Sequence, residues 1–221
     1  MAVGSHGGGG SVRGMTDATD FEDIPTTTLA ELLGRERVMD IGIRPLWGPL
    51  PPLAGPAFTV RCPPGDNLML HAAIYRAEPD SIVVVESGDL DYALAGGNVC
   101  AIAQQRGIAG FVVDGVIRDL GEVRAAGFPV FARGVIPIPG VKKAVLPLNE
   151  RVRCGGATVD AGDIVVADEE GIVVVPGDRQ VEILAGARAR LEKESAETLD
   201  DWEKAHRARV DELLRAGGFE E

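Results

Sequence analysis

The chain has 221 residues, of which 45% are hydrophobic and 25% charged, and these values predict one soluble globular domain with a sizeable core. An excess of 34 acidic over 22 basic side chains gives a net charge of −12, which argues against nucleic acid and acidic membranes as partners. No apolar run is long enough to span a membrane, no signal-peptide pattern opens the chain, and the 3 cysteines lack metal-ligand spacing. We therefore expect a cytoplasmic protein with reduced thiols.

Composition divides the chain into three parts. Residues 1–14 are rich in glycine and predict a flexible extension that takes no part in the fold. Residues 15–187 carry the alternating apolar and turn-forming segments expected of an α/β domain. Residues 188–221 are dense in charge and predict a helical extension at the C-terminus.

The first half of the domain predicts helices and strands in alternation. The elements are a helix at 29–33 with cap candidates at 26–28, an extended proline-rich loop at 45–56, a strand at 57–62, a helix that Asp66 or Asn67 caps and that runs to about Arg76, and a buried strand at 81–86. His71 lies inside the second helix. Because no second histidine or cysteine accompanies it, we interpret it as a packed residue and not as a metal ligand.

The second half predicts short strands followed by one long helix. The elements are a helix from Asp119 to Ala126 with Gly127 as its C-terminal cap, strands at 129–133, 151–153, 163–167 and 171–175, and a final helix from a cap at Asp178 to about Leu214. The beginning of the final helix should pack on the domain, and the part beyond Lys193 should project from it. Strands without intervening helices indicate a β-rich flank, so the predicted class is α/β with a mixed sheet.

The segment from Gly96 to Asp119 is the most informative part of the sequence. Gly96 and Gly97 lead into a short helix, for which Asn98 is the expected N-cap and Gly107 the expected C-terminal glycine. A buried strand at 110–113 should follow and end at Asp114-Gly115, before Arg118 and Asp119.

The two ends of this segment offer complementary chemistry. A glycine-rich turn at a helix start exposes backbone N–H groups to an anion. The planar guanidinium of Arg118 suits a carboxylate, and Asp119 is a hard oxygen ligand for a divalent cation. The pattern therefore predicts a pocket for a small anion beside a metal. Two simpler interpretations stay open, because Asp119 could cap a helix with Glu122 completing a capping box, or could form a solvated ion pair with Arg118.

The same segment resembles the signature of the RraA-like family, which includes the class II 4-hydroxy-4-methyl-2-oxoglutarate aldolases. That signature is an acidic residue or glycine, twenty intervening residues and then Arg-Asp, which Gly97 and Arg118-Asp119 match. The resemblance covers about residues 21–187. Further matching segments are Pro64–Asn67, Asp114–Gly115, Phe128–Gly134 and Gly162–Asp168.

The resemblance implies a fold, an assembly and a reaction. The fold is a β/β/α sandwich of the swivelling-domain type with a mixed sheet and a long C-terminal helix, and the assembly is a homotrimer with active sites at subunit interfaces. The reaction is the cleavage of a small 2-oxo acid through a pyruvate enolate, by aldol cleavage or by decarboxylation of oxaloacetate. Asp119 would hold Mg²⁺ or Mn²⁺ and Arg118 would stabilise the enolate oxygen. The turn at Gly96 and Gly97 and the N–H groups of Asn98 and Val99 would bind the substrate carboxylate.

Other reactive groups fit this chemistry less well. A Schiff-base aldolase needs a desolvated lysine, but Lys142 and Lys143 lie in a predicted loop, and Lys193 and Lys204 lie in the charged final helix. Cys100 has no histidine near it in sequence, so we interpret it as a packed residue and not as a nucleophile.

The chain departs from the family's aldolases at Gly97, where those enzymes tend to carry an acidic residue. We therefore expect this chain to decarboxylate oxaloacetate better than it cleaves an aldol substrate. The family also implies an acidic residue from the final helix of a neighbouring subunit, for which Glu192 and Glu194 are candidates, although a solvated helix face explains them equally well. The alternative function is that of a non-catalytic regulator that binds a ribonuclease or another partner protein, as some members of the family do.

Overall fold

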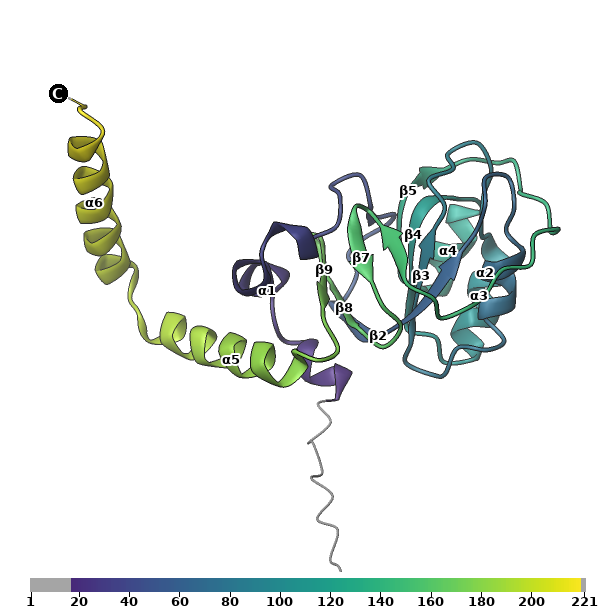
Figure 1. Cartoon of the computed structure of the whole chain (residues 1–221), viewed down its shortest axis with the longest axis horizontal. Helices are drawn as coiled ribbons and strands as arrows, with labels where there is room; N and C mark the ends of the chain where they lie inside the picture. The colour runs from purple at the N-terminus through teal and green to yellow at the C-terminus, as the bar shows by residue number, and fades with distance from the viewer. Residues whose placement is uncertain (1–16, 220–221) are drawn as a thin grey trace, which may run out of the picture.

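The computed structural model describes residues 17–219, so the predicted extension at 1–14 lies outside the described residues. Its centre is a seven-stranded mixed sheet in the order β1-β5-β4-β3-β2-β8-β9, in which β2, β3, β4 and β5 are parallel (Figure 1). The strands are β1 (Arg44–Pro45), β2 (Leu53–Arg61), β3 (Ile82–Glu86), β4 (Gly110–Ile117), β5 (Val130–Val135), β8 (Ile164–Ala167) and β9 (Ile172–Val175). A separate hairpin contains β6 (Val152–Cys154) and β7 (Ala157–Val159).

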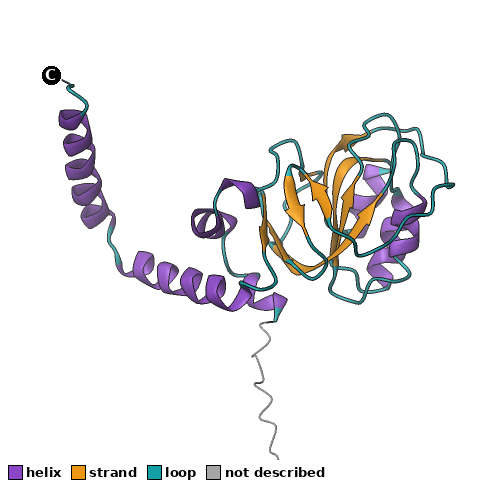
Figure 2. Cartoon of the chain, viewed as in Figure 1, coloured by secondary structure: helices purple, strands orange, loops and turns teal. Residues whose placement is uncertain are grey.

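Helices cover one face of the parallel strands, and the hairpin covers the other (Figure 2). The helices of the first layer are α2 (Leu68–Ala73), α3 (Gly97–Gln105) and α4 (Leu120–Ala126). Because neighbouring side chains of a strand point to opposite faces, Val83 and Val85 of β3 pack toward these helices, whereas Ile82 and Val84 pack toward the hairpin. The α/β class and the layered β/β/α sandwich that the sequence predicted are confirmed.

A third apolar cluster lies on the outer side of β8 and β9. There α1 (Thr26–Leu33) and the start of α5 (Gln180–Ala196) pack on these strands, and the short 3₁₀ helix η1 (Ala18–Phe21) adds the buried Phe21. A second short 3₁₀ helix, η2 (Arg35–Arg37), leads away from α1. These elements close the end of the sheet remote from α2 and α3 (Figure 1).

The predicted strands differ most from the structure at β2 and β4, and β1 and β7 were not predicted. The segment expected as a proline-rich loop contains Pro45 of β1 and the first residues of β2, from Leu53 to Pro56. Pro56 is tolerated in β2 because β3 pairs with β2 only from Ala57 onward, so the strand has a neighbour on one side at the proline. Likewise β4 continues through Asp114-Gly115, where a bulge shifts the register between Val113 and Val116 without ending the strand.

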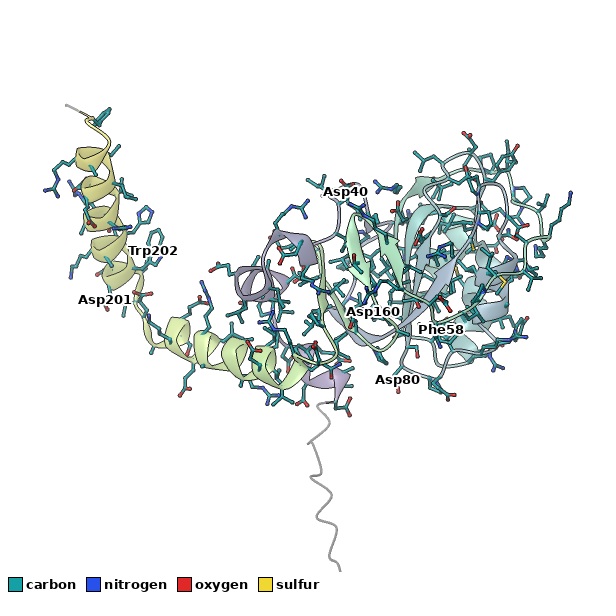
Figure 3. All side chains as sticks on the ribbon, in the orientation of Figure 1. Asp40, Phe58, Asp80, Asp160, Asp201 and Trp202 are labelled. Atoms are coloured by element: carbon teal, nitrogen blue, oxygen red, sulfur yellow. The ribbon has the colours of Figure 1, made fainter. Side chains whose placement is uncertain are left out.

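The predicted single final helix is wrong, because the chain forms α5 and then α6 (Leu199–Ala216). Glu197 is extended, and Thr198 caps α6 by accepting a hydrogen bond from the backbone N–H of Asp201. The cap at Asp178 is also wrong, since Arg179 occupies that position without a side-chain capping bond. Helix α6 has no buried residue and extends away from the domain, with Trp202 near its start (Figure 3).

Within residues 17–219, no helix combines the length and the apolar character that crossing a membrane requires.

Candidate active site

The site lies at the start of α3, beside the place where β4 ends and α4 begins. The segment just before Gly96 lies beside the end of β4, and two backbone hydrogen bonds join the two segments. The N–H of Leu94 donates to the carbonyl of Val116 at 2.9 Å, and the N–H of Arg118 donates to the carbonyl of Ala95 at 2.9 Å. The carboxyl ends of parallel strands meet at one edge of a sheet, which is where α/β proteins place their ligands. These two bonds therefore fix Gly96 next to Arg118.

Asp119 has an uncommon backbone conformation at this junction. It is left-handed, with φ of 57° and ψ of 37°, and its carboxylate makes no capping bond to α4. Instead Oδ2 accepts a hydrogen bond from the N–H of Gly97 at 3.2 Å and lies 3.3 Å from Nε of Arg118. The capping-box interpretation is therefore wrong, and strain held at a non-glycine residue is typical of functional positions.

The Arg118–Asp119 pair stays accessible to a ligand. The two side chains expose 41% and 37% of their surfaces. An ion pair this exposed contributes little to the stability of the fold.

Side chains of neighbouring residues fill the space beside both glycines of the turn. A Cβ at Gly96 would lie 2.5 Å from Oδ2 of Asp119, and a Cβ at Gly97 would overlap Oε2 of Glu122. Neither position can therefore accept a side chain unless a carboxylate moves.

Glu122 is the residue that the sequence interpretation missed as part of the site. Its carboxylate lies directly against Gly97, in the space that a side chain at position 97 would occupy. The signal was present as Arg-Asp-x-x-Glu, because residues three apart in a helix lie on one face. The same spacing also describes a capping box, and the sequence analysis considered only that role.

The start of α3 provides free backbone donors. The first bond inside α3 runs from the N–H of Cys100 to the carbonyl of Gly96 at 3.1 Å, so the N–H groups of Asn98 and Val99 have no acceptor within the helix. Asn98 is the second helical residue and not the predicted N-cap, which is Gly96. The N–H groups of both residues remain available to an anion.

A cavity of about 70 Å³ brings most of these groups together, which is far smaller than the 300–1,000 Å³ typical of sites for drug-sized ligands. Five of the predicted site residues line it, whereas Gly97 and Glu122 do not. Its lining residues are Asn67, His71, Ala93, Ala95, Gly96, Asn98, Val99, Arg118, Asp119, Pro139 and Lys142.

Two further side chains in the wall shape its charge. Burial, together with the positive charges of Lys142 and Arg118, lowers the pKa of His71 to about 4, so the imidazole is neutral at neutral pH. Lys142 lies in a loop whose backbone the buried Asp66 holds through the N–H groups of Lys143 and Ala144 at 2.7 and 3.0 Å.

The carboxylates fit a weakly held divalent cation. Among the described residues, no group of three or more His, Cys, Asp or Glu side chains is arranged to hold a metal ion. Asp119 and Glu122 nevertheless flank the same glycine turn, and Mg²⁺ often binds through one or two carboxylates while it keeps its waters. Cys100 is fully buried and burial raises the pKa of its thiol to about 12, which excludes a reactive thiolate.

Glu192 and Glu194 are not brought to this cavity within one chain. They lie in α5, which packs beside α1 at the other end of the domain (Figure 1). Glu194 is bound to Arg190 at 2.7 Å within the same helix.

The chain is similar to known proteins in sequence and in fold. The chain is 34% identical over 199 residues to a protein of Halalkalibacterium halodurans named "Putative 4-hydroxy-4-methyl-2-oxoglutarate aldolase". The aligned region covers 89% of this chain and 94% of that protein. Solved structures with the same fold include the RNA-processing inhibitor RraA from Thermus thermophilis, with a TM-score of 0.64, 26% identity and coverage of 70% and 93%. Another is RraAS2 of Streptomyces coelicolor, an unusual member of the RNase ES inhibitor RraA family, with a TM-score of 0.68, 27% identity and coverage of 87% and 96%.

A family model described as RraA-like, Aldolase/RraA, matches residues 16–174, which include every residue of the cavity wall. The chain belongs to the RraA-like family.

Proposed function

We propose that this protein is a divalent-metal-dependent carbon–carbon lyase that acts on small 2-oxo acids, with Mg²⁺ or Mn²⁺ as its metal. The supporting observation is the left-handed Asp119, whose carboxylate faces the glycine turn and Arg118 instead of capping α4. A protein that only binds a partner has no need of a carboxylate held in this way beside free backbone donors. The same observation favours the lyase over the non-catalytic regulator.

Each residue of the site has a role in this proposal. The N–H groups of Asn98 and Val99 bind the substrate carboxylate at the positive end of α3. Arg118 donates to the 2-oxo oxygen, where negative charge develops as the bond beyond C3 breaks, and a charge-assisted hydrogen bond of this kind contributes about 1.5–3 kcal/mol. Asp119 and Glu122 would hold the cation, which supplies Lewis-acid polarisation of the 2-oxo group when bound.

We also propose that the protein is a homotrimer in which a neighbouring subunit covers this cavity. Apolar side chains are exposed on both segments that flank the cavity wall, including Tyr92 beside Ala93 and Val141 beside Lys142. Exposed apolar side chains that gather around a pocket are typical of an interface. The exposed apolar residues of these two segments are Leu90, Tyr92, Ile138, Val141 and Val145. Sedimentation equilibrium should give three times the chain mass of 23.2 kDa, and a monomer would contradict the proposal.

Oxaloacetate decarboxylation with and without metal tests the function. Activity should disappear in excess EDTA and return with Mg²⁺ or Mn²⁺, because two carboxylates hold the ion only weakly. Free metal ions also decarboxylate oxaloacetate, so the rate without protein at each metal concentration must be subtracted. Full activity in excess chelator would contradict the metal-dependent mechanism, and no activity under any condition would favour the regulator.

A further inference from the structure

Helix α6 has one apolar face that nothing in the described part of the chain covers. None of its residues is buried, and the helix extends away from the domain (Figure 1). Because each residue of an α-helix is rotated by about 100° from the one before, five of its side chains fall within roughly 80° of arc. This α6 stripe consists of Leu199, Trp202, His206, Val210 and Leu213, all of them exposed, and Leu214 lies at its edge.

A helix of 18 residues with such a stripe needs a packing partner. Most of the stability of a helix in a protein comes from the packing of its amphipathic face and not from helix propensity. In the middle of the stripe, the ring of His206 stacks on that of Trp202 with 4.5 Å between their centroids, so the two rings form one continuous surface. The α6 stripe is therefore one half of an interface.

The spacing of the α6 stripe identifies the other half. Its residues follow one another at steps of 3, 4, 4 and 3, so the pattern is the same in both directions from His206. Two copies that run antiparallel about a two-fold axis at His206 place Leu199 of each copy opposite Leu213 of the other, and Trp202 opposite Val210. Such reciprocal contacts are the property of a two-fold interface between identical chains. An unrelated partner would not require this symmetry.

The charges of α6 also favour the antiparallel direction. The half before His206 carries three acidic side chains and one lysine, whereas the half after it carries three arginines and two acidic side chains. An antiparallel pair brings the acidic half of one copy beside the arginine-rich half of the other, and flanking charges of this kind set the orientation of paired helices. In this register, Glu203 of each copy lies within about 3 Å, measured along the axis, of Arg207 of the other.

We propose that α6 is a self-association element, which pairs antiparallel with α6 of a second copy of this chain about a two-fold axis at His206. The pairing does not depend on the proposed reaction. It joins two separate domain assemblies, because the contacts around a three-fold axis are not reciprocal. A pair of such short helices is weak, so the mass of three chains expected for the trimer is the dilute limit of a larger assembly.

Sedimentation equilibrium of the full chain at increasing concentration tests the pairing, and the average mass should rise above its dilute value. Leu213→Lys should weaken this association roughly a hundredfold or more, because two-fold symmetry removes a buried leucine twice from each pair. Ala208→Lys is the matched control, since it adds the same charge on the opposite side of α6, and it should stay within about twofold of the unmodified protein. Far-UV circular dichroism should show the same helix content in all three proteins.

A mass that does not change with concentration would overturn the proposal. An equal effect of Leu213→Lys and Ala208→Lys would also overturn it, because the association would then not involve the α6 stripe.

Cysteine crosslinking tests the direction of the pair. The three native cysteines are buried, so a cysteine introduced into α6 is the accessible one. A short bis-maleimide should join Leu199→Cys chains to Leu213→Cys chains when the two proteins are mixed. Leu199→Cys alone should not crosslink, because the two copies of residue 199 lie about 21 Å apart along the axis of an antiparallel pair. Crosslinking of Leu199→Cys to itself without the mixed product, or no crosslinking at all, would overturn the antiparallel pair.

Discussion

Replacing Asp119 with asparagine should lower metal-dependent decarboxylation of oxaloacetate roughly a hundredfold or more without unfolding the protein. Lewis-acid polarisation is worth several kcal/mol, and each 1.36 kcal/mol is a factor of ten in rate. Asparagine keeps the shape of aspartate and tolerates the left-handed conformation that the residue has at φ of 57°. Only the negative charge is lost, so the loss of activity reports on cation binding.

Asp80→Asn is a matched control for this variant. Asp80, labelled in Figure 3, has the same left-handed backbone, with φ of 64°, but lies in the turn before β3, where its N–H donates to Gly107 just beyond the end of α3 and not at its start. Steady-state rates across Mg²⁺ concentrations and thermal unfolding should be measured for both variants. Asp80→Asn should match the unmodified protein in rate, and a fully active Asp119→Asn would show that the cation binds elsewhere.

Asp119→Ala would be harder to interpret, because alanine in the left-handed region costs about 1–2 kcal/mol. A loss of activity in that variant would mix backbone strain with loss of charge.

The local part of the site could be predicted from the sequence because its groups are close along the chain. The glycine turn, the helix that ends before Gly107 and the Arg118-Asp119 pair all follow from short-range patterns. Glu122 could not be assigned in this way, since a capping box and a carboxylate aimed at Gly97 require the same spacing. Only the fold shows that Glu122 occupies the space that a side chain at position 97 would need.

Asn67 is a different case, because it contacts residues that are distant in the sequence. The sequence marks it as a possible helix cap, but its amide contacts Ala93 and its backbone contacts Val141. No short-range pattern describes such a wall.

The long helix that the sequence predicted for the C-terminus was wrong for a local reason. The segment Thr198-Leu199-Asp200-Asp201 is a capping pattern that starts a new helix, but the apolar residues on either side suggested one continuous periodicity.

The sequence suggested that glycine at position 97 leaves the site without an acidic group. The closeness of Glu122 to Gly97 changes that expectation. The chain carries a carboxylate in that space from α4 instead of α3. We therefore expect Glu122→Gln to lower aldol cleavage at least a hundredfold, the lower end of the contribution of a positioned proton acceptor. Decarboxylation, which needs no such acceptor, should fall less, and it should fall through a higher requirement for Mg²⁺.

Moving the carboxylate back to position 97 should restore what Glu122→Gln removes. Gly97→Asp alone should be nearly inactive and less stable, because a Cβ at Gly97 would overlap Oε2 of Glu122 and lie 2.9 Å from its Cβ and Cδ. Glu122→Gly removes all three of these atoms, so the double variant Gly97→Asp/Glu122→Gly has room for the new side chain. We expect it to cleave 4-hydroxy-4-methyl-2-oxoglutarate at least about tenfold faster than either single variant, a non-additivity that two residues sharing one space should produce. Rates of cleavage and decarboxylation, with unfolding temperatures, should be measured for all four proteins. If the two substitutions act independently, Glu122 does not stand in for the missing acid, and the proton acceptor for aldol cleavage must come from elsewhere, such as Glu192 or Glu194 of a neighbouring subunit.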